Sequence, residues 1–200
     1  LIDLRHTQLG ILLALLLLTA PELSAESAED RAALSAYLNH ALSADHGFED
    51  RYAAEVWLVY MQQRLAHFLA DPADPAEALD LLTRVHQQAS ELNLPPELVL
   101  SVIEVESTFD RYAISRVGAQ GLMQVMPFWK DEIGRGDDNL TDTPTNLRYG
   151  CHILRFYLDR EHQNLNRALA AYNGSSGSLR YPNKVRAAWE NHWRTAPLDW

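Results

Sequence analysis

The sequence predicts a mainly α-helical protein with a small irregular or β insert, and two observations lead to this fold class. Apolar residues recur at helical spacing through most of the chain after residue 26, in segments that begin or end at Pro or Gly. Between Asp110 and Pro127 this pattern stops, and β-forming residues alternate with turn residues. We expect no long β-strands, which excludes doubly wound and barrel architectures.

Size and composition fit one well-cored domain with a short helical extension. The chain has 200 residues, of which 47% are hydrophobic and 22% are charged, as in ordinary globular proteins. Its formal net charge of −10 is unsuited to the phosphate contacts that clustered Lys and Arg make with nucleic acids. We therefore expect no nucleic-acid partner.

The first segment has the character of an export signal. The apolar stretch Leu9–Ala20 is shorter than the roughly 20 residues that a membrane-spanning helix needs. Arg5 precedes it, and Leu23–Glu26 offers a cleavage region after it. We therefore assign residues 1–25 to a secretory signal peptide. A membrane tether remains open as an alternative if this segment is not cleaved.

The helical N-terminal region is expected to span residues 26–91. Its first helix covers residues 26–45, and the second covers Glu49–Asp71 and stops at the following proline. The third has Asp74 as its N-cap, Pro75 at the first helical position and Glu77 as capping-box partner.

Residues 92–200 continue with further helices on both sides of the insert. One helix begins at Pro95-Pro96, and the polar stretch Asp131–Asn146 is expected to be a loop. Thr143 is expected to cap the next helix, with Pro144 as its first residue. Two shorter helices follow, one ending at Asn173-Gly174 and one starting at Tyr181.

Neither a disulfide nor a metal site is expected. Cys151 is the only cysteine, so it cannot form an internal disulfide, and its apolar helical surroundings predict a packing role. The eight histidines show no spacing typical of metal ligands, so we predict no bound metal.

Two glutamates, Glu104 and Glu106, stand one residue apart in the segment VIEVESTFD. On a helix, Glu106 falls in the middle of an apolar face that includes Val102 and Phe109, whereas Glu104 falls outside it. We therefore expect Glu104 to be solvated and to make surface ion pairs at most. Burial of Glu106 would raise its pKa, which suits a proton donor to a leaving oxygen. The alternative is a helix-end carboxylate that reaches solvent or caps a loop N–H group.

Four motifs follow one another from this point: Glu106-Ser107, Ser115–Pro127, Asn146–Gly150 and Ala170–Gly174. In this order and spacing they resemble the catalytic domain of the soluble lytic transglycosylases, which share a fold with goose-type lysozymes. The resemblance covers roughly Leu92–Trp193, about half of the chain. It implies a lysozyme-like (α+β) catalytic domain over 92–200, onto which the N-terminal region packs as a small helical cap.

The resemblance also implies the residues of the site. Glu106 corresponds to the single catalytic acid. The implied substrate-binding residues are Ser115, Gln124 and Met126 in the saccharide cleft, and Tyr172 and Asn173 beside the acid. Ser and Gln can pair with sugar hydroxyl and N-acetyl groups, Met packs adaptably on sugar faces, and the Tyr172 hydroxyl could orient the carboxyl group. For Met126 and Tyr172, simple packing remains the alternative.

The implied activity is cleavage of the β-1,4 bond between N-acetylmuramic acid and N-acetylglucosamine in peptidoglycan, leaving a 1,6-anhydro-muramic end. This makes glycan strands the partner, requires no cofactor, and suits an exported, periplasmic monomer. Ordinary glycosidases use two carboxylates, but the candidates for a second one fit a solvated surface better. These candidates are Asp110, Asp131, Glu132, Asp137 and Asp138. The alternatives are a lysozyme-like muramidase and a non-catalytic peptidoglycan-binding factor.

The chain departs from the commoner family pattern after Asn173. Many members continue with an Ala-Gly-Pro-Gly type loop, whereas this chain has GSSGSLRYPNKV over Gly174–Val185. Because this segment borders the expected cleft, the choice between exo and endo cleavage stays open. Tyr181 within it either stacks on a sugar or packs the last helix.

Overall fold

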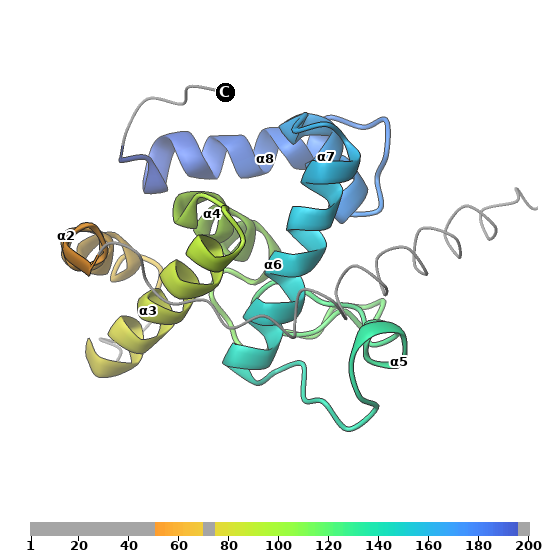
Figure 1. The fold of residues 1–200 in the computed structure, drawn as a ribbon, viewed down its shortest axis with the longest axis horizontal. Coiled ribbons are helices and arrows are strands. Elements are labelled where there is room, and N and C mark those ends of the chain that lie inside the picture. Colours follow the sequence, from red (N-terminus) through yellow and green to blue (C-terminus); the bar gives the residue numbers. More distant parts are fainter. Residues whose placement is uncertain (1–50, 70–74, 196–200) are drawn as a thin grey trace, which may run out of the picture.

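The computed structural model describes residues 51–69 and 75–195 of the chain. The predicted signal peptide over 1–25, the first expected helix over 26–45 and the N-cap residue Asp74 all lie outside the described residues. The mainly α-helical fold class is confirmed (Figure 1). The described helices are α2 (Arg51–Leu65), α3 (Pro75–Glu91), α4 (Pro96–Ser107), α5 (Trp129–Ile133), α6 (Thr143–Arg160), α7 (Leu165–Tyr172), α8 (Arg180–Ala188) and the π-helical turn η1 (Trp189–Trp193).

The insert between α4 and α5 has the irregular character that the sequence predicts. Two isolated antiparallel bridges, Ile114 with Gln120 and Gln120 with Val125, are its β structure within the described residues. Gly121 in this loop has φ +73°, and a Cβ there would lie 2.4 Å from the carbonyl oxygen of Leu140. Glycine is therefore required on both backbone and steric grounds.

Three helix boundaries differ from the prediction. A short helix, α5, occupies the start of the expected polar loop. The N-cap of α6 is Asp142 and not Thr143, because the Asp142 carboxylate accepts a hydrogen bond from the Thr145 N–H at 3.2 Å. Helix α2 ends at Leu65, six residues early, and the chain turns so that Phe68 packs against Phe109 and Trp193.

Helix α4 lies in the interior of the fold, between α3 and the C-terminal pair α8 and η1 (Figure 1). Buried residues of all these helices form one hydrophobic cluster, which also includes Met61 and Leu65 of α2. Each large aliphatic side chain buried there contributes about 1.5–3 kcal/mol to stability. The N-terminal helices therefore pack on the remainder of the chain, while the boundary at residue 91 stays a prediction.

Asn146, at the start of α6, ties the insert to this core. Its side chain is fully buried and accepts a hydrogen bond from the Met123 N–H at 2.7 Å. Its amide group donates to the carbonyl oxygens of Gln120 at 2.8 Å and Leu140 at 2.7 Å. Burial makes these three bonds expensive to lose, so Asn146 fixes the course of the loop.

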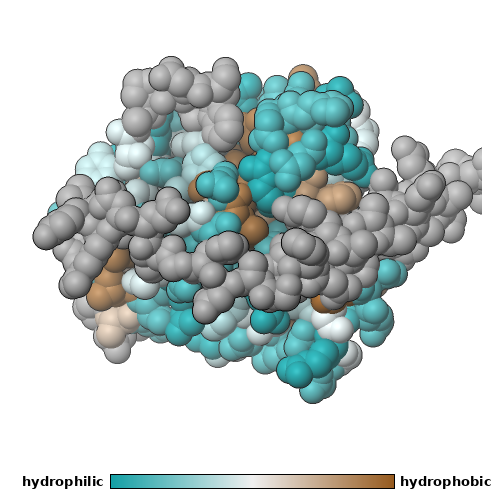
Figure 2. Space-filling view, viewed as in Figure 1, coloured by the Kyte–Doolittle hydropathy of each residue, from teal (hydrophilic) through white to brown (hydrophobic). Residues whose placement is uncertain are grey.

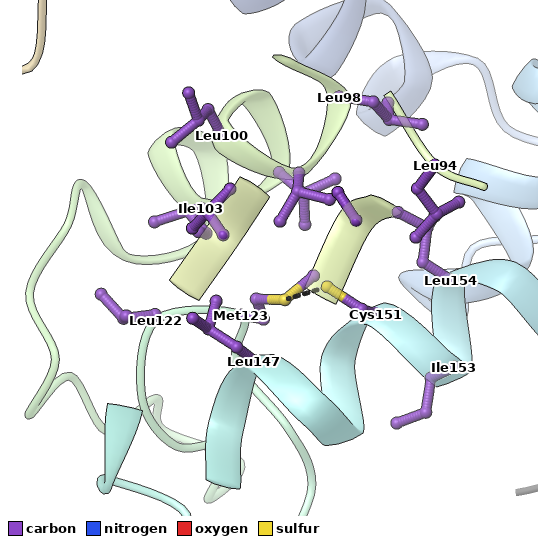
Figure 3. Packing of buried hydrophobic residues seen from close by; sticks show 14 of the residues in the cluster. Leu94, Leu98, Leu100, Ile103, Leu122, Met123, Leu147, Cys151, Ile153 and Leu154 are labelled. Atoms are coloured by element: carbon purple, nitrogen blue, oxygen red, sulfur yellow. Dashed lines mark hydrogen bonds between the residues drawn. The ribbon is translucent and has the colours of Figure 1, made fainter. Parts of the chain in front are cut away.

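The Met123 side chain packs against α6 at a point where only glycine fits. A Cβ on Gly150 would lie 2.4 Å from the Met123 sulfur, and the Cys151 thiol lies 3.9 Å from the same atom (Figure 3). Cys151 is fully buried, which confirms its predicted packing role.

The side of the molecule seen in Figure 2 is mainly hydrophilic over the described residues, with a small apolar area near its centre. Within the described part, no helix is long and apolar enough to cross a membrane.

Candidate active site

Glu106 lies on the last turn of α4, where the helix ends in an unusual backbone conformation. Thr108 and Phe109 both have positive φ angles, of 51° and 64°. This region is rare for a β-branched residue such as Thr and costs about 1–3 kcal/mol per residue. Phe109 is buried between Phe68 and Trp193, at ring-centre distances of 5.5 and 5.4 Å, and this burial offsets the strain. The aromatic cluster thus fixes the end of the helix that carries Glu106.

A second contact fixes the same turn to the insert. The Ser107 hydroxyl lies 2.8 Å from the carbonyl oxygen of Leu122 and 3.1 Å from that of Ile103 within α4. Since Asn146 holds the neighbouring Met123, the insert and the end of α4 have a defined relative position. Preorganisation of this kind is what a catalytic side chain requires.

The Glu106 carboxyl group is half-buried and receives one hydrogen bond from the C-terminal helix. The Tyr181 hydroxyl, itself almost fully buried, donates to Glu106 Oε1 at 2.7 Å. Burial raises the pKa of Glu106, while the Tyr181 hydrogen bond and the nearby Lys184 ammonium act more weakly in the opposite direction. The expected desolvation of Glu106 is confirmed, and its side chain is suited to hold a proton at higher pH than an exposed glutamate.

Glu106 opens into a pocket of about 340 Å³ between α4, the end of α7 and the start of α8. The lining residues are Val105, Glu106, Asn173, Ser175, Ser178, Arg180, Tyr181 and Lys184. Hydroxyl, amide and cationic groups predominate, a set that suits a polar ligand with many hydroxyl groups. Among the described residues that line it, Glu106 is the only acid.

Two candidates for a second carboxylate, Asp110 and Asp138, have other contacts, and the expected solvated position is wrong for Asp138, whose side chain is only 11% exposed. Asp110 is exposed and accepts a hydrogen bond from the Tyr112 N–H at 2.9 Å. Asp138 accepts a 2.5 Å hydrogen bond from the Tyr149 hydroxyl and lies 3.9 Å from Arg135, and its pKa is held below the usual range mainly by the Tyr149 bond. Within residues 51–69 and 75–195, no group of three or more His, Cys, Asp or Glu residues is arranged to hold a metal ion.

The structure brings Asn173 into the same pocket as Glu106, but the Tyr172 hydroxyl points elsewhere. It donates to the carbonyl oxygen of Met123 at 2.8 Å, so it anchors the insert. The tyrosine hydroxyl that bonds Glu106 therefore belongs to Tyr181 and not to Tyr172. For Tyr181, neither sugar stacking nor packing alone describes its position, because its ring is buried and its hydroxyl contacts the acid.

The three other predicted cleft residues do not line this pocket. The Ser115 hydroxyl accepts a hydrogen bond from the Ala119 N–H at 3.0 Å. The Gln124 amide donates to the carbonyl oxygens of Ala113 and Gly121 at 3.1 and 3.0 Å. Met126 is partly buried against the core cluster. These contacts shape the insert, and the predicted role of Ser115, Gln124 and Met126 in binding sugar stays a prediction.

The expectation for Glu104 is wrong. Its side chain is only 16% exposed and accepts a hydrogen bond from the indole N–H of the buried Trp193 at 2.7 Å. His192 Nδ1 lies 2.9 Å from its other oxygen. The apolar arc on α4 could not reveal this, because both partners come from η1, almost 90 residues later in the chain.

Sequence reasoning also missed the role of Tyr181, although a signal was present. Tyr181, Val185 and Ala188 recur at helical spacing and form the buried side of α8. A tyrosine on a buried helical face needs a partner for its hydroxyl group, and the buried acid on α4 is such a partner.

Comparisons with known proteins bear on this arrangement. The family model described as the transglycosylase SLT domain matches residues 84–192, which is more than half of the chain and includes α4 and α8. A protein named "Transglycosylase" from Enterobacteria phage PRD1 is 34% identical over 110 residues, covering 55% of this chain and 40% of the phage protein. "Membrane-bound lytic murein transglycosylase C" of Actinobacillus pleuropneumoniae serotype 5b (strain L20) is 44% identical over 50 residues, covering 25% and 14% respectively. The chain thus spans less than half the length of these curated relatives.

Proposed function

The chain belongs to the transglycosylase SLT domain family, and on this premise we propose that it is a peptidoglycan lytic transglycosylase with Glu106 as catalytic acid and base. One observation carries the proposal: a half-buried carboxyl group with a raised pKa is the only acid among the described residues of its pocket. The names of the two relatives support the same activity.

In the first step, the protonated Glu106 donates its proton to the glycosidic oxygen between N-acetylmuramic acid and N-acetylglucosamine. The bond from this oxygen to C1 of the muramic residue breaks, and the N-acetylglucosamine part leaves with a hydroxyl group. The N-acetyl group of the muramic residue stabilises the positive charge that develops at C1.

In the second step, the Glu106 carboxylate accepts the proton of the C6 hydroxyl group on the same muramic residue. The C6 oxygen attacks C1 and closes a 1,6-anhydro ring, so no water is consumed and Glu106 regains its proton. Because the nucleophile is already part of the substrate, its high effective concentration replaces a water held by a second carboxylate. One acid in the pocket therefore suffices for this reaction.

Tyr181 is the positioning residue of this mechanism. Its hydroxyl group holds Glu106 Oε1, which leaves Oε2 to exchange the proton with the substrate. The same hydrogen bond stabilises the carboxylate that forms after proton transfer.

The remaining expectations complete the proposal. We place the protein in the periplasm, where peptidoglycan lies, and class it as a lyase because the proposed reaction breaks the glycosidic bond without consuming water. Asn173 reaches the substrate from the wall of the Glu106 pocket, and Ser115, Gln124 and Met126 contribute to the adjoining cleft, while Tyr172 supports it through the hydrogen bond to Met123. The monomeric state and the role of residues 26–91 as a cap belong to the same proposal.

Digestion of purified murein sacculi tests this function. Released muropeptides should carry 1,6-anhydro ends and weigh one water less than the products of a muramidase digested in parallel. Reducing-end products would instead identify a hydrolase, and sacculi bound without any release would identify a binding factor. Glu106→Gln should release neither kind of product.

A further inference from the structure

Two cations, Arg180 and Lys184, line the Glu106 pocket from α8. They are four residues apart, so their side chains leave the helix on the same side, and both residues are exposed. They lie in the Gly174–Val185 segment, where the sequence departs from the commoner family pattern.

Neither cation forms an ion pair within the described part of the chain, although a third cation of the same helix does. Arg186 lies 3.7 Å from Glu190, the residue one helical turn further on. The residue one turn after Arg180 is Lys184, and the residue one turn after Lys184 is Ala188. The pocket therefore presents two positive charges and one acid, Glu106, on a chain whose formal net charge is −10.

This placement does not stabilise the helix. Like charges four residues apart repel each other, and Arg180 occupies the first turn of α8, where the helix dipole disfavours a cation. The first turn of α8 contains no acid that would offset either effect. A pair of cations kept at a cost, and directed into a pocket with a catalytic acid, is suited to an anionic ligand.

We propose that Arg180 and Lys184 form a subsite for a carboxylate carried by the muramic residue of the substrate. This inference rests on the proposed function, because peptidoglycan places carboxylates next to the bond that Glu106 would cleave. The guanidinium of Arg180 can bind a carboxylate through two parallel hydrogen bonds, and Lys184 adds a compact charge beside it. Ser175 and Ser178, on the same wall, offer neutral hydroxyl groups to the ligand.

Two sources supply such a carboxylate. A muramic residue without a peptide has a free carboxylate on its lactyl group, whereas a peptide-bearing residue has its carboxylates along the peptide. Both are anionic, and an acidic protein repels an anionic polymer at long range. A local pair of cations orients the strand at the pocket and offsets this repulsion there.

The test measures whether the cations act through substrate carboxylates. The variants are Arg180→Gln with Lys184→Gln, and the matched control Arg186→Gln, which removes one cation of the same helix outside the pocket. Each is assayed on native sacculi and on sacculi whose carboxylates have been converted to neutral amides. On native sacculi, the double variant should need about tenfold more substrate for half-maximal rate, with little change in kcat.

On amidated sacculi, the wild-type protein should fall to the level of the double variant, and the double variant should lose nothing further. The subsite is refuted if the double variant needs no more native sacculi than the wild type for half-maximal rate. It is also refuted if the same difference between double variant and wild type persists on amidated sacculi. Arg186→Gln should behave like the wild type throughout. Strands freed of peptides by an amidase, which exposes the lactyl carboxylate, test the two sources: a loss retained there shows that the subsite accepts the lactyl carboxylate, and a vanished loss restricts it to peptide carboxylates.

Binding separates this inference from the proposed function. The wild type, the double variant and the Arg186→Gln control are prepared again with Glu106→Gln, and their retention on native and amidated sacculi is measured by sedimentation. If the wild-type products prove to have reducing ends, the proposed reaction fails, while the retention data still decide whether Arg180 and Lys184 bind a carboxylate.

Discussion

The last turns of helix α4 carry two glutamates, Glu104 and Glu106, whose environments differ. On one side, Glu106 faces an open pocket and receives one hydrogen bond, from Tyr181 of α8. On the other side, Glu104 contacts Trp193 and His192 of η1 and borders a second pocket, also of about 340 Å³. Both acids thus contact the C-terminal helices and border pockets, but Glu104 has a protein partner for each of its oxygens, whereas the contact of Glu106 is made by Oε1.

The difference shows that the type of residue and its depth in the structure do not determine its role. Glu104 has its oxygens directed at an indole N–H and an imidazole, so it holds η1 against α4. Glu106 has one oxygen held by Tyr181 and lines a pocket, so we expect it to exchange a proton with a substrate. We expect substitutions on the two sides to separate activity from stability.

The largest effect is expected for Glu106→Gln. Loss of the acid and base should reduce the rate of anhydro-muropeptide release by about 10³-fold or more, because no other carboxyl group lines the described part of the pocket. Circular dichroism should show an unchanged fold. Residual activity near the wild-type level would rule out Glu106 as the proton donor.

The same variant sharpens the comparison through the pH dependence of stability. Since folding raises the pKa of Glu106, its contribution to stability is fully present below the unfolded pKa and is lost as pH rises through the folded pKa. Glu106→Gln does not titrate, so its unfolding free energy relative to the wild type should increase with pH across this window. If the difference in unfolding free energy stayed constant from about pH 4, near the usual glutamate pKa, to about pH 8, the desolvation of Glu106 would be contradicted.

Glu104→Ala should affect stability more than activity. The variant leaves the buried Trp193 N–H group without its acceptor, which should lower the unfolding free energy by about 2–3 kcal/mol. Chemical denaturation at neutral pH measures this loss. The control Glu190→Ala removes an exposed carboxylate and should cost less than about 1 kcal/mol. A loss of kcat by Glu104→Ala as large as that of Glu106→Gln would erase the distinction between the two sides.

Two tyrosines provide the smallest and most specific contrast. Tyr181→Phe removes the hydrogen bond to Glu106, so kcat should fall about tenfold and the pKa of Glu106 should rise. Because activity requires protonated Glu106, the alkaline limb of the pH–rate profile should move to higher pH. Tyr172→Phe removes only the bond to the Met123 carbonyl oxygen and should cost about 1 kcal/mol of stability without moving that limb. Equal shifts in both variants would show that Tyr181 has no specific role.

Local patterns predicted the helices and the burial of Glu106, because both depend on residues within a few turns of one another. Pro75 and Pro95-Pro96 indicated where α3 and α4 begin, and the apolar arc around Val102 and Phe109 placed Glu106 inward. The end of α2 was misplaced because its position depends on Phe68 reaching Phe109 and Trp193, which are distant in sequence.

The partners of the two glutamates were not predicted, for the same reason. Tyr181 lies 75 positions after Glu106, and Trp193 lies 89 positions after Glu104. Periodicity shows which face of a helix is buried but not which helix covers it. The motif residues Asn146 and Gly150 illustrate a further limit, since their strongest contacts position Met123 in the insert and do not line the pocket.

Titration of the Glu106 carboxyl group tests the account most directly. In protein labelled with ¹³C in its glutamates, the Glu106 carboxyl signal is assigned by its absence from Glu106→Gln and followed with pH by NMR. The account predicts a midpoint above the ordinary glutamate value of about 4.3, and a still higher one in Tyr181→Phe. A midpoint at or below the ordinary value would contradict the proposal that the half-buried Glu106 holds the catalytic proton.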